Sequence, residues 1–173
     1  DSHFHLPKVT TSLETLKERE FKTFTKGFKA RAEMVMTAHI IVEKVDPKLP
    51  ATLSAKMLQE ILRTELRYKG LILSDDMEMK AMTDNFGEAE APFMALEAGC
   101  DVLLYHTEPH QIKAFDGLLS KLTSTEGSNA LKSLEASFKR LEDFKRKNLF
   151  PYKAIDISKM DGVIGCDEHK AVL

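Results

Sequence analysis

Hydrophobic residues follow two alternating patterns along the chain. In several segments they recur every three or four positions, which predicts helices with one apolar face. Between them lie short, almost continuous apolar runs, typical of strands buried on both faces. The predicted helices begin near Thr11, run from Ser54 to Gly70, cover about 88–98, and extend beyond Pro109. The last long helix follows a break near Gly127 and Ser128 and carries an apolar stripe on Leu131, Leu134, Phe138, Leu141 and Phe144.

Residues that suit helix ends mark several of these boundaries. Thr11 and Glu14 have the spacing of a capping box, and Ser54 can cap the second helix. Gly70 and Gly99 are expected to end the second and third helices, because glycine adopts the left-handed backbone conformation without a Cβ clash.

Three apolar runs are predicted strands, at 34–41, 71–73 and 102–105. Strands that alternate with helices favour a parallel α/β sheet. Three strands are too few to close a barrel, and a (β/α)8 barrel typically needs ~250 residues. The sequence therefore predicts an α/β fold that forms the later part of a (β/α)8 TIM barrel, about three βα units. We expect the earlier strands upstream of Asp1 or in another chain.

Composition and charge exclude several classes of protein. The 173 residues are 43% hydrophobic, enough for one sizeable core. The chain has 25 Lys plus Arg and 27 Asp plus Glu, a net charge of −2. Such a near-neutral chain lacks the positive potential that attracts a nucleic acid or an anionic membrane. No apolar run approaches the ~20 residues of a membrane-spanning helix. Two cysteines, Cys100 and Cys166, are too few for a disulfide-stapled scaffold.

Polar side chains follow each predicted strand, where parallel α/β proteins carry their functional groups. His39 ends the first strand, Asp75 and Asp76 end the second, and His106 follows the third. Adjacent carboxylates after an apolar strand cost free energy unless charge is needed there. Structural interpretations stay open, since one aspartate can cap the next turn and either histidine can be a hydrogen-bonded packing residue.

The first three residues, Asp1-Ser2-His3, are a second candidate site. Residues i and i+2 of an extended segment point the same way, so the Asp1 carboxylate can hold the His3 imidazole and leave its other nitrogen for proton transfer. A metal-dependent hydrolase is an alternative, because His3 and His5 have the spacing of a metal pair on a strand. A free amine at Asp1 together with His3 would also suit Cu(II).

Five segments, in order, resemble motifs of family 3 glycoside hydrolases of the β-N-acetylhexosaminidase (NagZ) type. They are Asp1-Ser2-His3 with Leu6-Pro7, Val35-Met36-Thr37-Ala38-His39, Pro50-Ala51-Thr52-Leu53-Ser54, Gly70-Leu71-Ile72-Leu73-Ser74-Asp75-Asp76-Met77-Glu78-Met79 and Ala98-Gly99-Cys100-Asp101-Val102-Leu103-Leu104. Met77 departs from the family's pattern, which more often has leucine there. The resemblance implies that residues 1–150 are the C-terminal part of the family's TIM-barrel catalytic domain and that 151–173 form a tail.

The resemblance also implies a role for each matching residue. Asp75 is the expected nucleophile, His3 the acid/base, and Asp1 the group that orients His3. Substrate-binding roles are expected for His39, Asp76 and Met77, with no metal and no cofactor. The sugar-binding Lys-His pair and arginine that the family carries upstream do not occur here. The missing N-terminal part of the barrel is therefore an expected partner, as a separate chain or an upstream segment.

The implied activity is that of a retaining exo-β-N-acetylglucosaminidase. Asp75 would attack the anomeric carbon while His3 protonates the leaving oxygen, and His3 would then activate water in a double displacement. The implied substrate is non-reducing-end N-acetylglucosamine on peptidoglycan-derived muropeptides in a bacterial cytoplasm, with no nucleic acid or membrane as partner. A phosphorylase of the same fold and an inactive binding or structural homologue are the alternatives.

Overall fold

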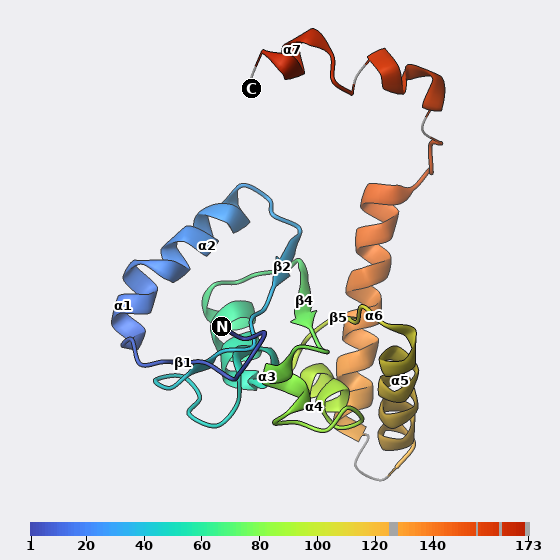
Figure 1. Ribbon diagram of the computed structural model, residues 1–173. Helices are drawn as coiled ribbons and strands as arrows, with labels where there is room; N and C mark the ends of the chain where they lie inside the picture. The colour runs from blue at the N-terminus through green and yellow to red at the C-terminus, as the bar shows by residue number, and fades with distance from the viewer. Residues whose placement is uncertain (125–127, 155, 163, 172–173) are drawn as a thin grey trace.

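The computed structural model describes residues 1–124, 128–154, 156–162 and 164–171, and helices alternate with strands along them (Figure 1). The strands are β1 (Lys8–Val9), β2 (Met34–Met36), β3 (Ile41–Val42), β4 (Leu71–Asp76) and β5 (Val102–Leu104). The helices are α1 (Leu13–Glu18), α2 (Glu20–Lys29), η1 (Ala51–Leu53), η2 (Lys56–Glu65), α3 (Lys80–Thr83), α4 (Ala91–Ala98), α5 (Glu108–Leu122), α6 (Ser128–Leu149), η4 (Ile157–Gly162) and α7 (Asp167–Lys170). The strand pairs are parallel, as predicted: β1 pairs with β3, and β4 lies between β2 and β5.

The sheet of β2, β4 and β5 has one covered face and one open face. Paired residues of parallel strands share a face, and successive residues alternate between faces. Val35 pairs with Ile72 on the face that packs against helices, where Ile72 is fully buried. Met36 pairs with Leu73 on the other face, and Met36 is 52% exposed. The prediction that this first strand is buried on both faces is therefore wrong, because Met34 and Met36 of β2 are 43% and 52% exposed, although Leu71 of β4, which pairs with Met34, is buried.

The predicted strand 34–41 is divided in two. β2 ends at Met36, and the chain bends before it enters β3, which pairs with β1 instead of β4. The bend turns His39 into the interior, where its side chain is fully buried. A continuous strand would not bring this ring to the partners described below, so tertiary hydrogen bonds decide where β2 stops.

The hydrophobic core lies between the covered face of the sheet and the helices η2 and α4. Its buried side chains include Leu58 of η2, Ile72 of β4, Met82 of α3 and Ala95 of α4. The predicted helices around 54–70 and 88–98 therefore bury their apolar faces as expected.

The apolar stripe predicted on the last helix is mostly exposed. In α6, Leu131 is 44% and Phe138 60% exposed, whereas Ser137 is buried. The side that packs inward carries Ser137 and Arg140, which both bind the carboxylate of Asp101. A buried polar junction, instead of the leucine stripe, thus holds α6. Of the predicted break, Gly127 lies outside the described residues, and α6 begins at Ser128.

The predicted helix ends match the structure in part. Ser12, one residue after the predicted Thr11, caps α1 through its hydroxyl. The Ser54 hydroxyl accepts an N–H of η2, as predicted, and Gly99 ends α4 with a φ of 109°. Gly70 does not end η2, which stops at Glu65. Gly70 instead passes so close to Tyr68 and Glu33 that a Cβ there would clash with both.

The tail after α6 extends away from the rest of the molecule (Figure 1). Its side chains Tyr152 and Ile157 are 78% and 76% exposed. No helix within the described ranges is long and apolar enough to cross a bilayer.

Candidate active site

Asp75 lies at the carboxyl end of β4. It stands between Leu73 and Asp76, where the pairing of β4 with β5 shifts register. The residue is half-buried, and its Oδ1 accepts the N–H of Asp76 at 2.8 Å. This is the one hydrogen bond that its carboxylate makes within the described chain, so most of the group is available to a ligand.

Hydrogen bonds fix both the backbone and the side chain of Asp76. Its N–H donates to Asp75, and its carbonyl accepts from Nε2 of His39 at 2.9 Å. Its Oδ1 accepts the N–H of Glu78 at 2.9 Å, and its Oδ2 lies 2.6 Å from Nδ1 of His106. Asp76 therefore connects the loop after β2 with the ends of β4 and β5, and it anchors the residue beside it, Asp75.

His39 holds this end of β4 from inside the protein. A carbonyl only accepts, so Nε2 of His39 carries the proton toward Asp76, and Nδ1 accepts from the Thr52 hydroxyl at 2.9 Å. Burial lowers the pKa of His39, although the Asp76 carbonyl favours the protonated ring. The side chain is 0% exposed. Both ring nitrogens are bonded inside the protein, and the sugar contact of His39 stays a prediction.

Met77 belongs to the core. Its side chain is 4% exposed and packs with residues of α3 and α4, while its N–H donates to the Leu104 carbonyl at 2.9 Å. It also lines a small cavity with Glu78 and His110, and its substrate-binding role stays a prediction.

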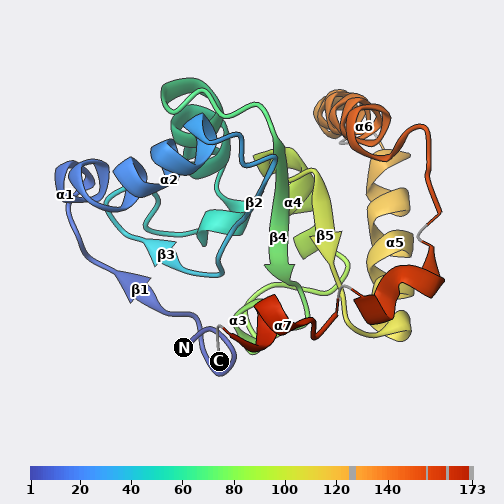
Figure 2. The same cartoon turned by 90° about the horizontal axis from the view of Figure 1, so that it is seen from above.

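The Asp1 carboxylate and the His3 ring are hydrogen-bonded, with 2.7 Å between Oδ1 and Nδ1. The contact forms in a turn and not in the extended segment that we predicted, since the N–H groups of Phe4 and His5 fold back onto the Asp1 carbonyl. Both side chains of the pair are exposed. The Ser2 carbonyl accepts the N–H of Ala81 at 3.3 Å, which places the loop beside α3, just beyond β4 (Figure 2).

Sequence analysis missed Glu78, the buried centre of a network at the ends of β4 and β5. Its side chain is 5% exposed. Oε1 accepts the N–H groups of His106 (2.9 Å) and Thr107 (2.7 Å), and Oε2 accepts the Thr107 hydroxyl (2.7 Å) and lies 3.0 Å from Nδ1 of His110. Burial opposes ionisation, but the hydrogen bonds from Thr107 and His106 outweigh it and lower the pKa of Glu78. The signal in the sequence was a carboxylate two residues after Asp76.

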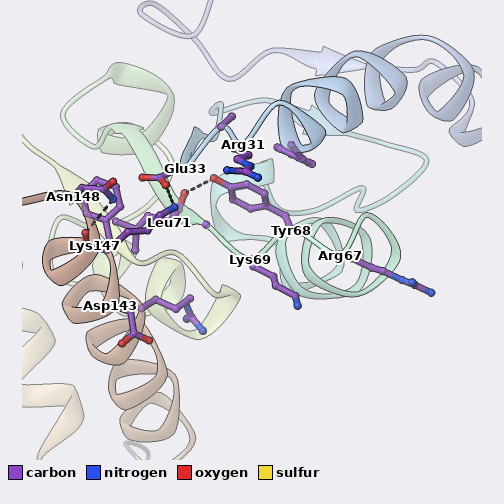
Figure 3. Close-up of a pocket in the computed structure, with 14 residues that line it drawn as sticks. Arg31, Glu33, Arg67, Tyr68, Lys69, Leu71, Asp143, Lys147 and Asn148 are labelled. Carbon is purple, nitrogen blue, oxygen red and sulfur yellow. Dashed lines mark hydrogen bonds and ion pairs between the residues drawn. The ribbon is translucent and has the colours of Figure 1, made fainter.

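A hollow of about 430 Å³ lies at the opposite end of the strands (Figure 3). Glu33, Leu71 and Lys147 are among its lining residues, and Leu71 opens β4. Asp75, at the far end of the same strand, does not line it. The hollow is therefore separate from the carboxyl end of β4, where Asp75 lies.

Comparisons with known proteins agree on one family. The family described as "Glycosyl hydrolase family 3 N terminal domain" matches residues 1–143. Proteins named beta-hexosaminidase from Alkalilimnicola ehrlichii and Idiomarina loihiensis are 36% and 32% identical to the chain. These alignments cover 66% and 84% of this chain but 32% and 44% of those proteins.

Solved structures agree as well. A glycoside hydrolase family 3 beta-N-acetylglucosaminidase from Paenibacillus sp. str. FPU-7 matches with a TM-score of 0.83 and 35% identity, over 90% of this chain and 30% of that one. The beta-N-acetylglucosaminidase from Thermotoga maritima matches with a TM-score of 0.74 and 31% identity, over 80% of this chain and 31% of that one. The chain spans less than half the length of each of these relatives. With its parallel strands and the family match over 1–143, the chain belongs to glycosyl hydrolase family 3, within the TIM-barrel-type N-terminal domain.

Proposed function

We propose that this chain supplies the nucleophile and the acid/base of a retaining exo-β-N-acetylglucosaminidase. The observation that carries the proposal is the position of Asp75, an available carboxylate at the carboxyl end of a parallel strand. TIM-barrel enzymes carry their catalytic groups at this end of their strands. The names of the relatives, beta-hexosaminidase and beta-N-acetylglucosaminidase, support the same substrate class.

In the proposed mechanism, Asp75 attacks the anomeric carbon and His3 transfers the proton. Because Asp1 occupies Nδ1 of His3, Nε2 is the atom that protonates the leaving oxygen and later takes a proton from water. An imidazole suits both steps, since its unperturbed pKa of about 6.5 lies near neutral pH. The N–H of Asp76 holds the attacking carboxylate in place.

We further infer that residues 1–150 are the later part of the barrel and that 151–173 are a tail. The outer edges of β2 and β5 have no strand partner in the described chain, and Met34 and Met36 of β2 are 43% and 52% exposed. The remaining strands, upstream or in a second chain, would pair with these edges and complete the sugar pocket. A muropeptide substrate and a bacterial cytoplasmic setting follow from the family resemblance alone.

The test is hydrolysis of a chromogenic N-acetyl-β-glucosaminide by the protein that contains this chain together with the rest of its barrel. Asp75→Asn is expected to abolish turnover, because it removes the nucleophile but keeps the shape of the side chain. Asp84→Asn is the matched control, since Asp84 is an exposed carboxylate at the end of α3. Full activity of Asp75→Asn would contradict the proposal.

A phosphorylase is the second candidate, because a neutral histidine in place of a second carboxylate does not repel an incoming phosphate. A structure titled Beta-glucoside phosphorylase BglX matches with a TM-score of 0.73 but at 23% identity, which shows a shared fold only. Product analysis with and without phosphate separates the two: a glycosyl phosphate would identify the phosphorylase, and free sugar in both reactions the hydrolase.

A further inference from the structure

We propose that Asp76, Glu78 and His106 form a binding site for a divalent transition-metal ion such as Zn²⁺. The three residues meet where β4 and β5 end. One ligand atom from each lies within 4.8 Å of the others. This site goes beyond the proposed glycosidase, whose chemistry needs no metal, and its ligands do not include Asp75.

The charge balance of this region favours a cation. The carboxylates of Asp76, Glu78 and Glu88 are close together, and one lysine, Lys113, pairs with Glu88 at 3.2 Å. The other ion pairs of these carboxylates in the described chain are to the imidazole rings of His106 and His110. The local potential is therefore negative, and a divalent ion would neutralise it.

The spacing of the ligand atoms is close to that of a tetrahedral site. Ligands at ~2.1 Å from Zn²⁺ lie ~3.4 Å from one another. Nε2 of His106 lies 3.5 Å from Oε2 of Glu78. The other ring nitrogen, Nδ1, lies 2.6 Å from Oδ2 of Asp76, so the ring must turn to give one nitrogen to an ion that both carboxylates bind. The His106 side chain is 64% exposed, so the ring has room to move when the ion enters.

The two carboxylates are already held in position. Two backbone N–H groups and the Thr107 hydroxyl fix Glu78, and the N–H of Glu78 and the ring of His39 fix Asp76. Such outer partners orient metal ligands and strengthen binding. Since Glu78 is buried and His106 is exposed, the ion has a fixed inner side and an open outer side, where water would be its fourth ligand.

The ligand set favours Zn²⁺ over Mg²⁺ or Ca²⁺. Imidazole with carboxylates suits zinc and its neighbours in the first transition row, whereas Mg²⁺ and Ca²⁺ prefer ligand sets made of oxygen.

Isothermal titration with Zn²⁺, and visible absorption with Co²⁺, test the site on the full chain. We expect one site, and we expect His106→Ala and Glu78→Gln each to weaken Zn²⁺ binding by more than about tenfold, since even the loss of an outer partner typically costs ~10–100-fold. The matched control is His169→Ala, which removes an exposed histidine of the tail and should bind Zn²⁺ like the unaltered chain.

The proposal would be overturned by no Zn²⁺ binding by the unaltered chain, by unchanged binding in both variants, or by loss of binding in His3→Ala but not in His106→Ala. The last result would assign the ion to Asp1 and His3. Equal binding of Mg²⁺ that survives His106→Ala would mean a simple acidic surface and would also refute the site. Circular dichroism checks folding, and His106→Gln, which keeps a polar side chain, replaces His106→Ala if that variant unfolds.

Discussion

At the scale of single residues, burial separates the groups that can meet a substrate from those that hold them. Asp75 and His3 are accessible, whereas His39 is covered and uses both ring nitrogens inside the protein. Asp75 and His39, which follow neighbouring strands, thus differ: the first is accessible to a ligand and the second bonds only within the protein. The difference comes from their surroundings and not from their own chemistry.

His3→Ala tests the proton-transfer role. A positioned acid typically contributes ~10²–10⁴-fold, so we expect a loss of about this size for a natural N-acetylglucosamine disaccharide. The loss should be much smaller for an aryl glycoside, because a good leaving group needs little protonation. Steady-state rates on both substrates in the assembled protein check this, and equal losses would exclude the acid role.

The burial of His39 leads to a prediction about how the stability of the protein depends on pH. Because burial lowers its pKa in the folded protein, the unfolded state takes up the proton first as the pH falls below about 6.5. The free energy of unfolding is therefore expected to decrease below that pH, and this residue should have no effect above it. Urea denaturation at pH 7.5 and 5.5 should show that the free energy of unfolding of His39→Gln changes less with pH than that of the unaltered protein. Replacing the exposed His5 by glutamine should leave the slope unchanged, and an equal slope in His39→Gln would refute the assignment.

At the scale of elements, one buried carboxylate joins the helices to the sheet. The Asp101 side chain is 0% exposed. Its Oδ2 accepts from Arg63 of η2 (2.5 Å) and from the N–H of Ile72 in β4 (2.8 Å), and its Oδ1 accepts from Ser137 and Arg140 of α6 (both 2.8 Å). This junction explains why α6 turns serine and arginine toward the sheet.

Asp101→Ala is expected to destabilise the protein by ~3–5 kcal/mol, because it leaves two arginines without their buried partner. The matched control is Asp143→Ala, which removes an exposed pair with Lys139 at 3.9 Å and should change stability by less than ~0.5 kcal/mol. Chemical denaturation of both variants measures the difference. Similar small effects would mean that the junction does not hold α6.

At the scale of the whole molecule, the main feature is the open face of the three-stranded sheet. Met34 and Met36 of β2 are exposed, and the outer edge of β2 has no strand partner in the described chain. An apolar face and an unpaired strand edge in water are unfavourable. Pairing with the rest of a barrel would cover both.

Hydrogen exchange tests that pairing. In the assembled protein, the amides of β2 are expected to exchange far more slowly than in this chain alone, since a neighbouring strand would then bind the free edge. The amides of β4, which is already paired on both sides, are the internal control and should change much less. Equal rates for β2 in the two states would contradict the proposed arrangement of the barrel.

The sequence by itself predicted the parallel strands that became β2, β4 and β5, the main helices between them and the position of Asp75 at a strand end. These properties depend on residues near one another in the chain, because helical and strand periodicity, caps and the run before Ser74 are local patterns. The family motifs added roles to the same local segments.

Only the tertiary structure decided which faces are covered and which polar groups meet. The division of 34–41, the exposed stripe of α6 and the network around Glu78 depend on partners distant in sequence: His39 bonds to Asp76, Ser137 to Asp101 and Glu78 to Thr107. A buried polar group must find a partner wherever the fold brings one. Local periodicity contains no information about that partner, so it could not place these residues.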